Sequence, residues 1–262
     1  MWPNANRIGE ISMKFTDRSP ATWKELQDDV ALFLNQSGYH AISPCTIETV
    51  RGKVEVDVFV ESPDELVKKI VCECKFWNSP VPKEKVHAFR TVVQDSGASL
   101  GLLISQTGFQ SGAIEAANLS NVRLVTWKEF TDIIADKWII TRLKRIKRTS
   151  VPLSEYINPF HFPFEKLKEE DKSRYLQACD KYTPLRFTCW TITKSDLEND
   201  MHLSDHWYQI SDYSSIESYL NFLLSQIDLA QKEFDEILTN SNIVIPSERF
   251  EKLDGYTYMF LE

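Results

Sequence analysis

Two carboxylates and one amine stand at a spacing that suits the cleavage of a phosphodiester bond. Asp57 is separated by fifteen residues from the triplet Glu73-Cys74-Lys75. Mg²⁺ prefers oxygen ligands and is commonly held by one or two carboxylates together with a substrate phosphate. A neighbouring ammonium group orients the attacking water or stabilises the charge that develops on the phosphate. These residue types predict a metal-dependent hydrolase, provided that the fold brings them together.

The segments that carry these residues have the pattern of β-strands. In residues 54–60 valine alternates with other residue types, which predicts a strand with the valines on one face and Asp57 on the other. In residues 69–75 the same alternation puts Glu73 and Lys75 on a common face. We expect the two strands to pair as an antiparallel hairpin. Pairing would bring both carboxylates within reach of one cation.

From Asp57 onward the chain resembles the PD-(D/E)XK nuclease superfamily, specifically its Mrr-type restriction endonuclease branch. The resemblance covers about residues 22–130 and implies a restriction endonuclease-like α/β sandwich with a mixed central sheet. The segments that match, in order, are a first helix ending at Gly38-Tyr39, the strands with Asp57 and Glu73-Cys74-Lys75, a helix over 83–94, a strand over 100–105, a helix over 111–118 and a strand over 122–125.

The resemblance also implies roles for individual residues. Asp57 and Glu73 would bind Mg²⁺ or Mn²⁺, the backbone carbonyl of Cys74 would be a further ligand, and Lys75 would be the catalytic amine. In this family water attacks phosphorus in line and leaves a 5′-phosphate. Many relatives carry a glutamate on the first helix where this chain has Gln27. Gln27 can hydrogen-bond a metal-bound water but brings no charge, so it is a catalytic candidate that leaves the number of metal ions open.

Four further residues are candidates for substrate binding. Gln106 and Thr107 follow an apolar strand and precede a helix, where hydroxyl, amide and backbone N–H groups often face a phosphate. An ordinary strand-to-helix turn with Ser111 as the N-cap explains the same residues equally well. Lys83 and Lys85 add positive charge near the expected site.

Composition limits the setting of the protein. The chain contains no stretch of eighteen apolar residues, and its N-terminus lacks a signal-peptide pattern, so we expect a soluble, cytoplasmic protein without a membrane partner. Its five cysteines are an odd number without metal-ligand spacing, which indicates reduced thiols. Cys72 and Cys74 are expected to be small core residues.

The distribution of charge predicts two domains. Residues 1–150 carry 20 Lys and Arg against 18 Asp and Glu, whereas residues 151–262 carry 10 against 20. We therefore predict a nuclease domain over 1–148 and a smaller, acidic α+β domain over 149–262. The basic run at 137–148 is either a phosphate-binding cluster or a solvated helix face.

The clearest element of the acidic domain is a long amphipathic helix. Apolar residues from Ile216 to Ile237 repeat at spacings of four and three, and Ser214 with Glu217 suggests a capping box. The apolar seam either forms a homodimer or higher oligomer, or packs inside its own domain. Residues 186–192 and 256–261 have the composition of strands.

The sequence therefore favours a Mg²⁺-dependent endodeoxyribonuclease that acts in restriction or anti-phage defence. One alternative is a DNA-repair nuclease. Another is a DNA-binding regulatory protein on a nuclease scaffold, either non-catalytic, as Gln27 would permit, or gated by a signal. In the gated case the acidic domain would bind a small-molecule or protein activator.

Overall fold

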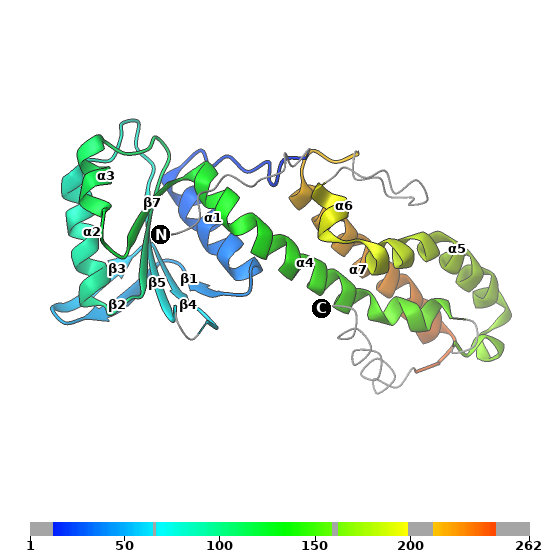
Figure 1. Ribbon diagram of the computed structural model, residues 1–262. Coiled ribbons are helices and arrows are strands. Elements are labelled where there is room, and N and C mark those ends of the chain that lie inside the picture. Colours follow the sequence, from blue (N-terminus) through cyan, green and yellow to red (C-terminus); the bar gives the residue numbers. More distant parts are fainter. Residues whose placement is uncertain (1–12, 65–66, 159–161, 199–211, 245–262) are drawn as a thin grey trace. The chain divides into compact units, whose positions relative to one another are not determined.

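A computed structural model describes residues 13–64, 67–158, 162–198 and 212–244 (Figure 1). The chain divides into two compact units. The first unit is Arg18–Thr141, and the second combines Met1–Asp17 with Arg142–Glu262. We refer to the first as the nuclease unit, after the family that its sequence resembles, and to the second as the helical unit.

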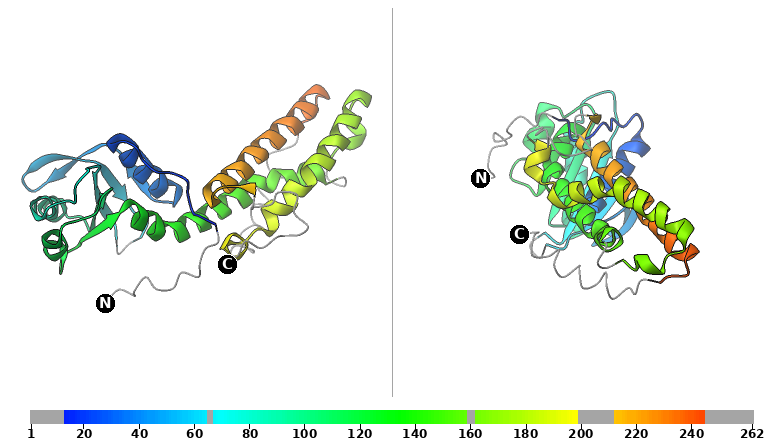
Figure 2. Two further views of the ribbon diagram at one scale, coloured as in Figure 1. Left: turned by 90° about the horizontal axis from the view of Figure 1, so that it is seen from above. Right: turned by 90° about the vertical axis from the view of Figure 1, so that its right-hand side faces the viewer.

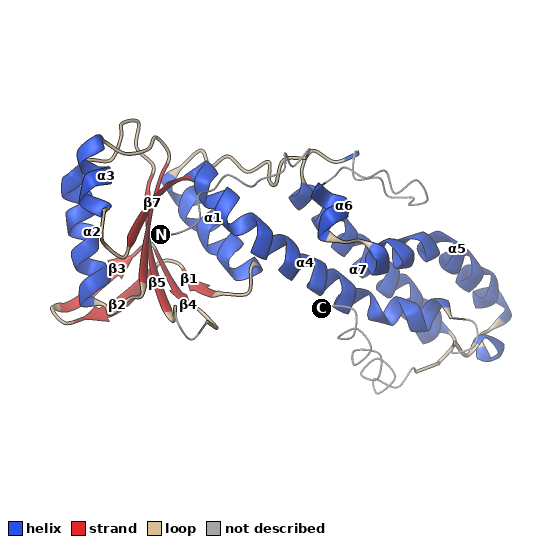
Figure 3. Ribbon diagram, viewed as in Figure 1, coloured by secondary structure: helices blue, strands red, loops and turns tan. Residues whose placement is uncertain are grey.

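The nuclease unit contains a mixed sheet, as predicted, and this sheet has five strands (Figure 3). Antiparallel pairing joins the first three strands in the sheet order, and parallel pairing joins the last three. Helix α1 lies on one face, and α2 and α3 lie on the other (Figure 1). The sheet order is β1 (His40–Ile42), β4 (Val58–Glu61), β5 (Lys69–Lys75), β6 (Leu100–Ser105) and β7 (Val122–Thr126), and the helices are α1 (Trp23–Gln36), α2 (Lys83–Asp95) and α3 (Ser111–Ala117).

The central strand β5 is buried on both faces. Val71 belongs to the apolar cluster that also contains Val86 and Phe89 of α2. Cys72 and Cys74 point to the other face and are fully buried, as the sequence predicted. Because side chains alternate along a strand, Glu73 and Lys75 lie on the same face as Val71. They lie closer to the C-terminal end of β5, where Lys75 is the last residue.

The predicted strand over residues 54–60 is interrupted at Asp57, so the prediction of a single valine face was wrong. A bend at Asp57 separates β3 (Gly52–Val56) from β4. β3 pairs with β2 (Cys45–Thr49) in a separate two-stranded sheet, whereas β4 pairs with β5. Val56 lies in the cluster on the α2 side, while Val58 is paired with Cys72 and faces the α1 side. Two competing strand partners explain the bend, because each takes the backbone hydrogen bonds of only one half.

A glycine in β6 lets α2 pack closely on the sheet. A Cβ atom at Gly101 would lie 2.5 Å from Val93 Cγ2 and 3.0 Å from Phe89 Cε1. Val86, Phe89 and Val93 are the buried residues of α2, in agreement with the predicted helix. This packing holds α2 against the strand next to β5, so its first turn stays near the end of β5 that carries Lys75.

Among its described residues, the helical unit contains helices and connecting segments but no strand, so the predicted α+β composition is not observed there. Its main contact joins α5 (Glu169–Thr191) and α7 (Ile216–Asn240), which lie side by side (Figure 2). The other helical elements are the second part of α4 (Trp127–Ile157), the 3-10 helix η1 (Phe164–Lys166) and α6 (Lys194–Glu198). Every residue of the predicted seam is fully buried, so the seam packs inside its own unit: Ile216, Leu220, Leu223, Ile227, Ala230, Phe234 and Ile237.

The strand predicted over residues 186–192 is wrong, because this segment forms the end of α5. Tyr182, Leu185 and Cys189 are buried at helical spacing. Aromatic and β-branched residues gave the segment a strand composition, and packing of the helix face against α7 overrides that preference. The other predicted strand, over 256–261, lies outside the described residues.

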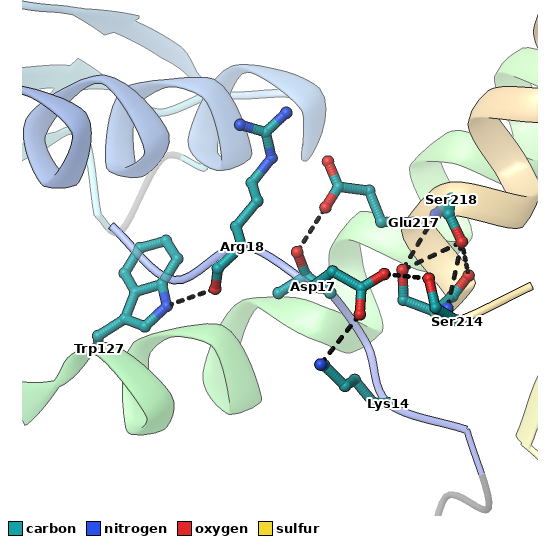
Figure 4. A network of polar contacts seen from close by, with 9 residues as sticks. Lys14, Asp17, Arg18, Trp127, Ser214, Glu217 and Ser218 are labelled. Atoms are coloured by element: carbon teal, nitrogen blue, oxygen red, sulfur yellow. Dashed lines mark hydrogen bonds and ion pairs between the residues drawn. The ribbon is translucent and has the colours of Figure 1, made fainter. Parts of the chain in front are cut away.

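The N-terminus of α7 is capped one residue later than predicted. Ser215 is the N-cap and forms a capping box with Ser218. The two residues of the predicted box have other partners: Ser214 Oγ donates to Asp17, and Glu217 accepts from Thr16 Oγ1 (Figure 4). The sequence-based prediction failed because it did not include residues far away in the chain.

The segment before the nuclease unit completes the start of α7. Ile216 N donates to the carbonyl of Lys14 and Glu217 N to that of Phe15, each at 3.0 Å. These bonds satisfy N–H groups that the first turn of a helix leaves without a partner. Residues 13–17 therefore belong with the helical unit, although the charge pattern assigned them to the nuclease domain.

Arg18 is the first residue of the nuclease unit. Its carbonyl accepts from Trp127 Nε1 at 3.1 Å (Figure 4), and its guanidinium pairs with Asp29 at 2.6 Å. The second division between the units falls between Thr141 and Arg142, inside α4, whereas the charge shift suggested residue 148. Charge marks a change of composition, but packing decides where one compact unit ends.

All five cysteines are free thiols, as their odd number suggested. Within the described ranges, none of the helices combines the length with the apolar character needed to cross a membrane.

Candidate active site

Asp57 and the Glu73-Cys74-Lys75 triplet come together at the end of β5. The carboxylate of Asp57 accepts a hydrogen bond from the backbone N–H of Cys74 at 2.6 Å, through Oδ2. Because Cys74 lies between Glu73 and Lys75, this bond places the Asp57 carboxylate directly beside the other two functional groups. The bend that interrupts the predicted strand is what turns Asp57 toward this position.

Glu73 and Lys75 form an ion pair on one face of β5. The Lys75 ammonium contacts Glu73 Oε1. The Glu73 side chain is 26% exposed and that of Lys75 19% exposed, so both are partly shielded from water and still accessible. Partial burial strengthens their electrostatic interactions with each other and with a phosphate group.

Burial raises the pKa of Asp57 above that of an ordinary aspartate. The N–H of Cys74 favours the ionised carboxylate and acts in the opposite direction, while the negative charge of Glu73 raises the pKa further. Ionised Asp57 is therefore maintained at a cost to folding. A cation bound between the two carboxylates would offset that cost.

The donor atoms fit a hard divalent cation. Two carboxylates and the carbonyl of Cys74 are oxygen ligands of the kind that Mg²⁺ and Mn²⁺ prefer. Burial raises the pKa of the Cys72 and Cys74 thiols far above neutrality, so neither is available as a thiolate ligand. Among the described residues there is no group of three or more His, Cys, Asp or Glu side chains that could hold a metal. Asp57, Glu73 and the carbonyl of Cys74 are the oxygen donors at this strand end that could hold such a cation.

Gln27 lies beside Asp57 but contacts its main chain. The buried amide of Gln27 donates from Nε2 to the carbonyl oxygen of Asp57 at 2.9 Å, and its Oε1 accepts from Lys24 Nζ at 3.4 Å. This geometry makes Gln27 a residue that holds the Asp57 bend. Lys24, which sequence reasoning missed, lies one helical turn before Gln27 and also pairs with Asp28 at 2.7 Å.

The backbone N–H groups of the turn after β6 donate hydrogen bonds to other groups of the protein. Gln106 N donates to the carbonyl of Lys75 at 3.1 Å, and Thr107 N donates to Ser105 Oγ at 3.3 Å. Gly108 N also donates to Ser105 Oγ, at 3.1 Å. These backbone groups, for which a phosphate contact was one of two alternatives, have partners within the protein. What they do is fix the turn against the end of β5 that carries Lys75.

The turn differs from the predicted one with Ser111 as the N-cap. The Thr107 hydroxyl donates to the carbonyl of Ser79 at 2.9 Å, and both Gln106 and Thr107 are exposed. Ser111 is the first residue of α3, and the N-cap is Gln110, whose side chain makes no capping bond. Gln106, whose backbone N–H is bonded to Lys75, has an exposed side chain.

Lys83 and Lys85 occupy the first turn of α2, and both are exposed. Lys85 Nζ lies 5.9 Å from the centroid of the Trp77 ring, and Lys75 Nζ lies 5.6 Å from the same centroid. Sequence reasoning did not identify Trp77. Its position two residues after Lys75 was the available signal, because residues i and i+2 of an extended chain point to the same side.

Residues 19–134 match the Mrr_cat family model, whose description is restriction endonuclease. These residues form a restriction endonuclease domain. The domain includes Asp57, Glu73 and Lys75, and it agrees with the resemblance inferred over about residues 22–130. The chain therefore carries a nuclease domain of the PD-(D/E)XK type, built on the mixed α/β fold described above.

Two solved structures resemble parts of the chain. The first, a protein of unknown function named AF1548, is 20% identical with a TM-score of 0.38, over 44% of this chain and 66% of that one. The second, the DNA modification-dependent restriction endonuclease AspBHI, is 13% identical with a TM-score of 0.24, over 47% of this chain and 39% of that one. The chain thus spans less than two thirds of either protein. No curated protein matches it.

Proposed function

We propose that this protein is a Mg²⁺-dependent endonuclease that hydrolyses phosphodiester bonds of DNA. One observation carries the proposal: the Asp57 carboxylate is bonded to the N–H of Cys74, while Glu73 and Lys75 are in contact on the same strand. Two carboxylates and an ammonium group are thus gathered at one strand end within a restriction endonuclease domain.

Asp57, Glu73 and the carbonyl of Cys74 would hold Mg²⁺ or Mn²⁺. When bound, the cation would polarise a phosphoryl oxygen and lower the pKa of a water molecule. The raised pKa of Asp57 supports this assignment, because a carboxylate that is costly to ionise gains from a nearby positive charge.

The protein groups would position the reactants. The N–H of Cys74 holds the Asp57 carboxylate, and the amide of Gln27 holds the Asp57 main chain. The Lys75 ammonium would donate hydrogen bonds to the attacking water or to a non-bridging phosphate oxygen, where negative charge develops. In-line attack would leave a 5′-phosphate, as the family resemblance implies.

Cleavage of plasmid DNA tests this proposal. Wild-type protein with Mg²⁺ or Mn²⁺ should nick or cut the plasmid, and EDTA should abolish the activity. Lys75→Met should lose activity, whereas Lys69→Met, an exposed lysine at the other end of the same strand, should retain it. Absence of cleavage with either metal, combined with unchanged DNA binding in both variants, would instead favour a non-catalytic DNA-binding protein.

Calorimetric titration with Mn²⁺ separates metal binding from catalysis. Wild-type protein should bind Mn²⁺, and Asp57→Asn should bind it much more weakly while remaining folded. Equal affinity in the two proteins would contradict the assignment of Asp57 as a ligand, whatever the outcome of the cleavage assay.

The proposed setting is the cytoplasm of a prokaryotic cell, in defence against foreign DNA. The family description, restriction endonuclease, supports this setting over DNA repair. Expression of the wild-type protein should lower the plating efficiency of phage, and expression of Asp57→Asn should not. Increased sensitivity of a deletion strain to DNA damage, without an effect on phage, would favour repair.

A nuclease gated by the helical unit is a second candidate. Residues 14–17 are bonded to the start of α7, and the next residue, Arg18, opens the nuclease unit. A small-molecule or protein activator that alters the start of α7 would therefore act on the residues directly before the nuclease unit. Loosening this segment in the full-length chain with Thr16→Val should change the cleavage rate. An unchanged rate would count against gating through this segment, and light scattering would establish whether the protein forms a homo-oligomer.

A further inference from the structure

The Trp77 ring lies near the ammonium groups of two lysines that belong to different elements. Its partly buried ring packs against the apolar cluster on the α2 side of the sheet. Lys75 Nζ, from the last residue of β5, lies 5.6 Å from the ring centroid. Lys85 Nζ, from the first turn of α2, lies 5.9 Å from it.

An aromatic ring attracts an ammonium group that lies within about 6 Å of its centroid, and the indole of tryptophan does so most strongly. Both lysines meet this condition. The ammonium group of a lysine is carried on a flexible four-carbon chain, so without such a contact it samples many positions. The Trp77 ring is anchored by its apolar neighbours and can therefore keep two cations at the same end of the site.

We propose that Trp77 is a positioning residue that couples Lys85 to Lys75, and that Lys85 binds a phosphate next to the one that is cleaved. The ligand is the phosphodiester backbone of a nucleic acid strand, so this inference rests on the proposed function. Lys75 is already paired with Glu73, which ties it to the reacting end. Lys85 has the exposure needed to reach the strand.

Salt dependence of DNA binding measures the contribution of each lysine. A lysine that neutralises one phosphate releases a counterion and contributes about 0.9 to the slope of log K against log salt concentration. Lys85→Met should lower the slope by about this amount, and Trp77→Leu should lower it equally. The double variant that carries both substitutions should have the same slope as either single variant. Trp77→Phe, which keeps an aromatic face, should retain most of the wild-type slope.

Lys83 supplies a matched control. It lies in the same turn of α2, but its side chain packs toward Gly112, where Cδ is 3.6 Å from the position of an added Cβ. Lys83→Met and Trp77→Leu should therefore have additive effects on DNA binding. Additivity of Trp77→Leu with Lys85→Met, or an unchanged slope in a folded Trp77→Leu protein, would overturn the proposal. If Trp77→Leu fails to fold, the same double-mutant cycle with Trp77→Met, which also removes the aromatic face, decides between coupling and additivity.

Steady-state kinetics with a DNA substrate provide a second measurement. Lys85→Met should chiefly raise KM, whereas Trp77→Leu should raise KM and also lower kcat, because Lys75 then keeps its contact with Glu73 but loses the one with the ring. The DNA-binding measurements on the single and double variants are made in EDTA, so they do not require cleavage. If the wild-type protein binds DNA but never cuts it, the proposed function is wrong. The binding measurements still test whether Trp77 couples Lys85 to Lys75. A wild-type protein whose DNA binding does not respond to salt would overturn the coupling itself.

Discussion

Two aspartates, one in each unit, show how differently the two regions use polar groups. Burial raises the pKa of Asp57 in the nuclease unit. In the helical unit, the hydroxyl of Ser214, followed by Lys14 and Ser215, lowers the pKa of Asp17 to about 2. Folding therefore disfavours the ionised form of Asp57 and favours that of Asp17. The nuclease unit gives up stability to place a carboxylate where it can act, whereas the helical unit gains stability from its carboxylate.

The same contrast extends to other buried polar residues. In the helical unit, Asp171 accepts from Ser241 Oγ at 2.9 Å, and Ser241 Oγ also accepts from Lys168 N at 3.1 Å. These bonds join the start of α5 to the end of α7. In the nuclease unit, the buried amide of Gln27 is directed to Asp57. Polar groups connect helix ends in one unit and support the candidate site in the other.

The largest expected effect is that of Asp57→Asn, which tests both sides of the comparison. Loss of this proposed metal ligand would remove several kcal/mol of transition-state stabilisation, so DNA cleavage should fall by at least about a thousandfold. The melting temperature at neutral pH should rise, because the neutral amide avoids the free-energy cost of a buried, ionised carboxylate. Cleavage assays and calorimetry measure the two effects.

The pH dependence of the Asp57 effect has a definite sign. A carboxyl group with a raised pKa in the folded state favours folding below its unfolded value of 3.8, and this contribution disappears as the pH rises through the folded pKa. The stability gained by Asp57→Asn should therefore be greatest above that range and vanish in acid. A lower melting temperature for the variant at neutral pH would contradict the comparison.

Phe234→Ala should have the largest effect on the helical unit. Phe234 is fully buried, stacks on Tyr156 with ring centroids 5.1 Å apart, and lies 6.1 Å from the Tyr175 ring. Truncating a buried phenylalanine costs about 3–5 kcal/mol. Chemical denaturation should detect this loss, while the exposed Leu229 provides the control, since Leu229→Ala should change stability by at most about 0.5 kcal/mol. Equal effects of the two substitutions would be inconsistent with the buried seam.

Lys75→Met should lower the cleavage rate by about a hundredfold, the range expected for one group that stabilises transition-state charge. Its effect on the melting temperature should be small, because Lys75 is an accessible residue at a strand end. Comparison with Lys69→Met in the same cleavage assay separates this role from a general loss of positive charge. Similar activity of the two variants would exclude Lys75 as the catalytic amine.

The smallest effect is expected for Asp17→Asn. A lowered pKa means that ionised Asp17 stabilises the folded state above pH 3.8, and that this contribution is lost as the pH falls toward 2. The substitution should therefore remove part of the acid sensitivity in this range and leave the slope near neutral pH unchanged. Denaturation of both proteins at several acidic pH values tests this, and identical acid sensitivity would show that Asp17 contributes nothing.

Local periodicity was sufficient for much of the nuclease unit. The helix over 83–95 and the strand over 100–105 follow from apolar spacing, and the common face of Glu73 and Lys75 follows from the alternation of side chains. These features depend on residues that are near in sequence. The expected proximity of Asp57 to the triplet is also observed, although the strand that was predicted to deliver it is bent.

The remainder depended on partners distant in sequence. Residues 186–192 have the composition of a strand and became helical through packing against α7. The capping box at Ser215 replaced the predicted one because Asp17 and Thr16 occupy the earlier candidates. Neither outcome could be read from the local segment alone.

By itself, the sequence determined that Glu73 and Lys75 share a face, because side-chain direction follows the local backbone of an unbroken strand. It also determined which family the nuclease domain resembles. Only the tertiary structure decided that Asp57 lies in a bend between two sheets, that Gln27 holds its main chain, and that Trp77 lies beside Lys85. The physical reason is competition. Each backbone group and each charge selects among partners from the whole chain, and that selection is made only when the chain is folded.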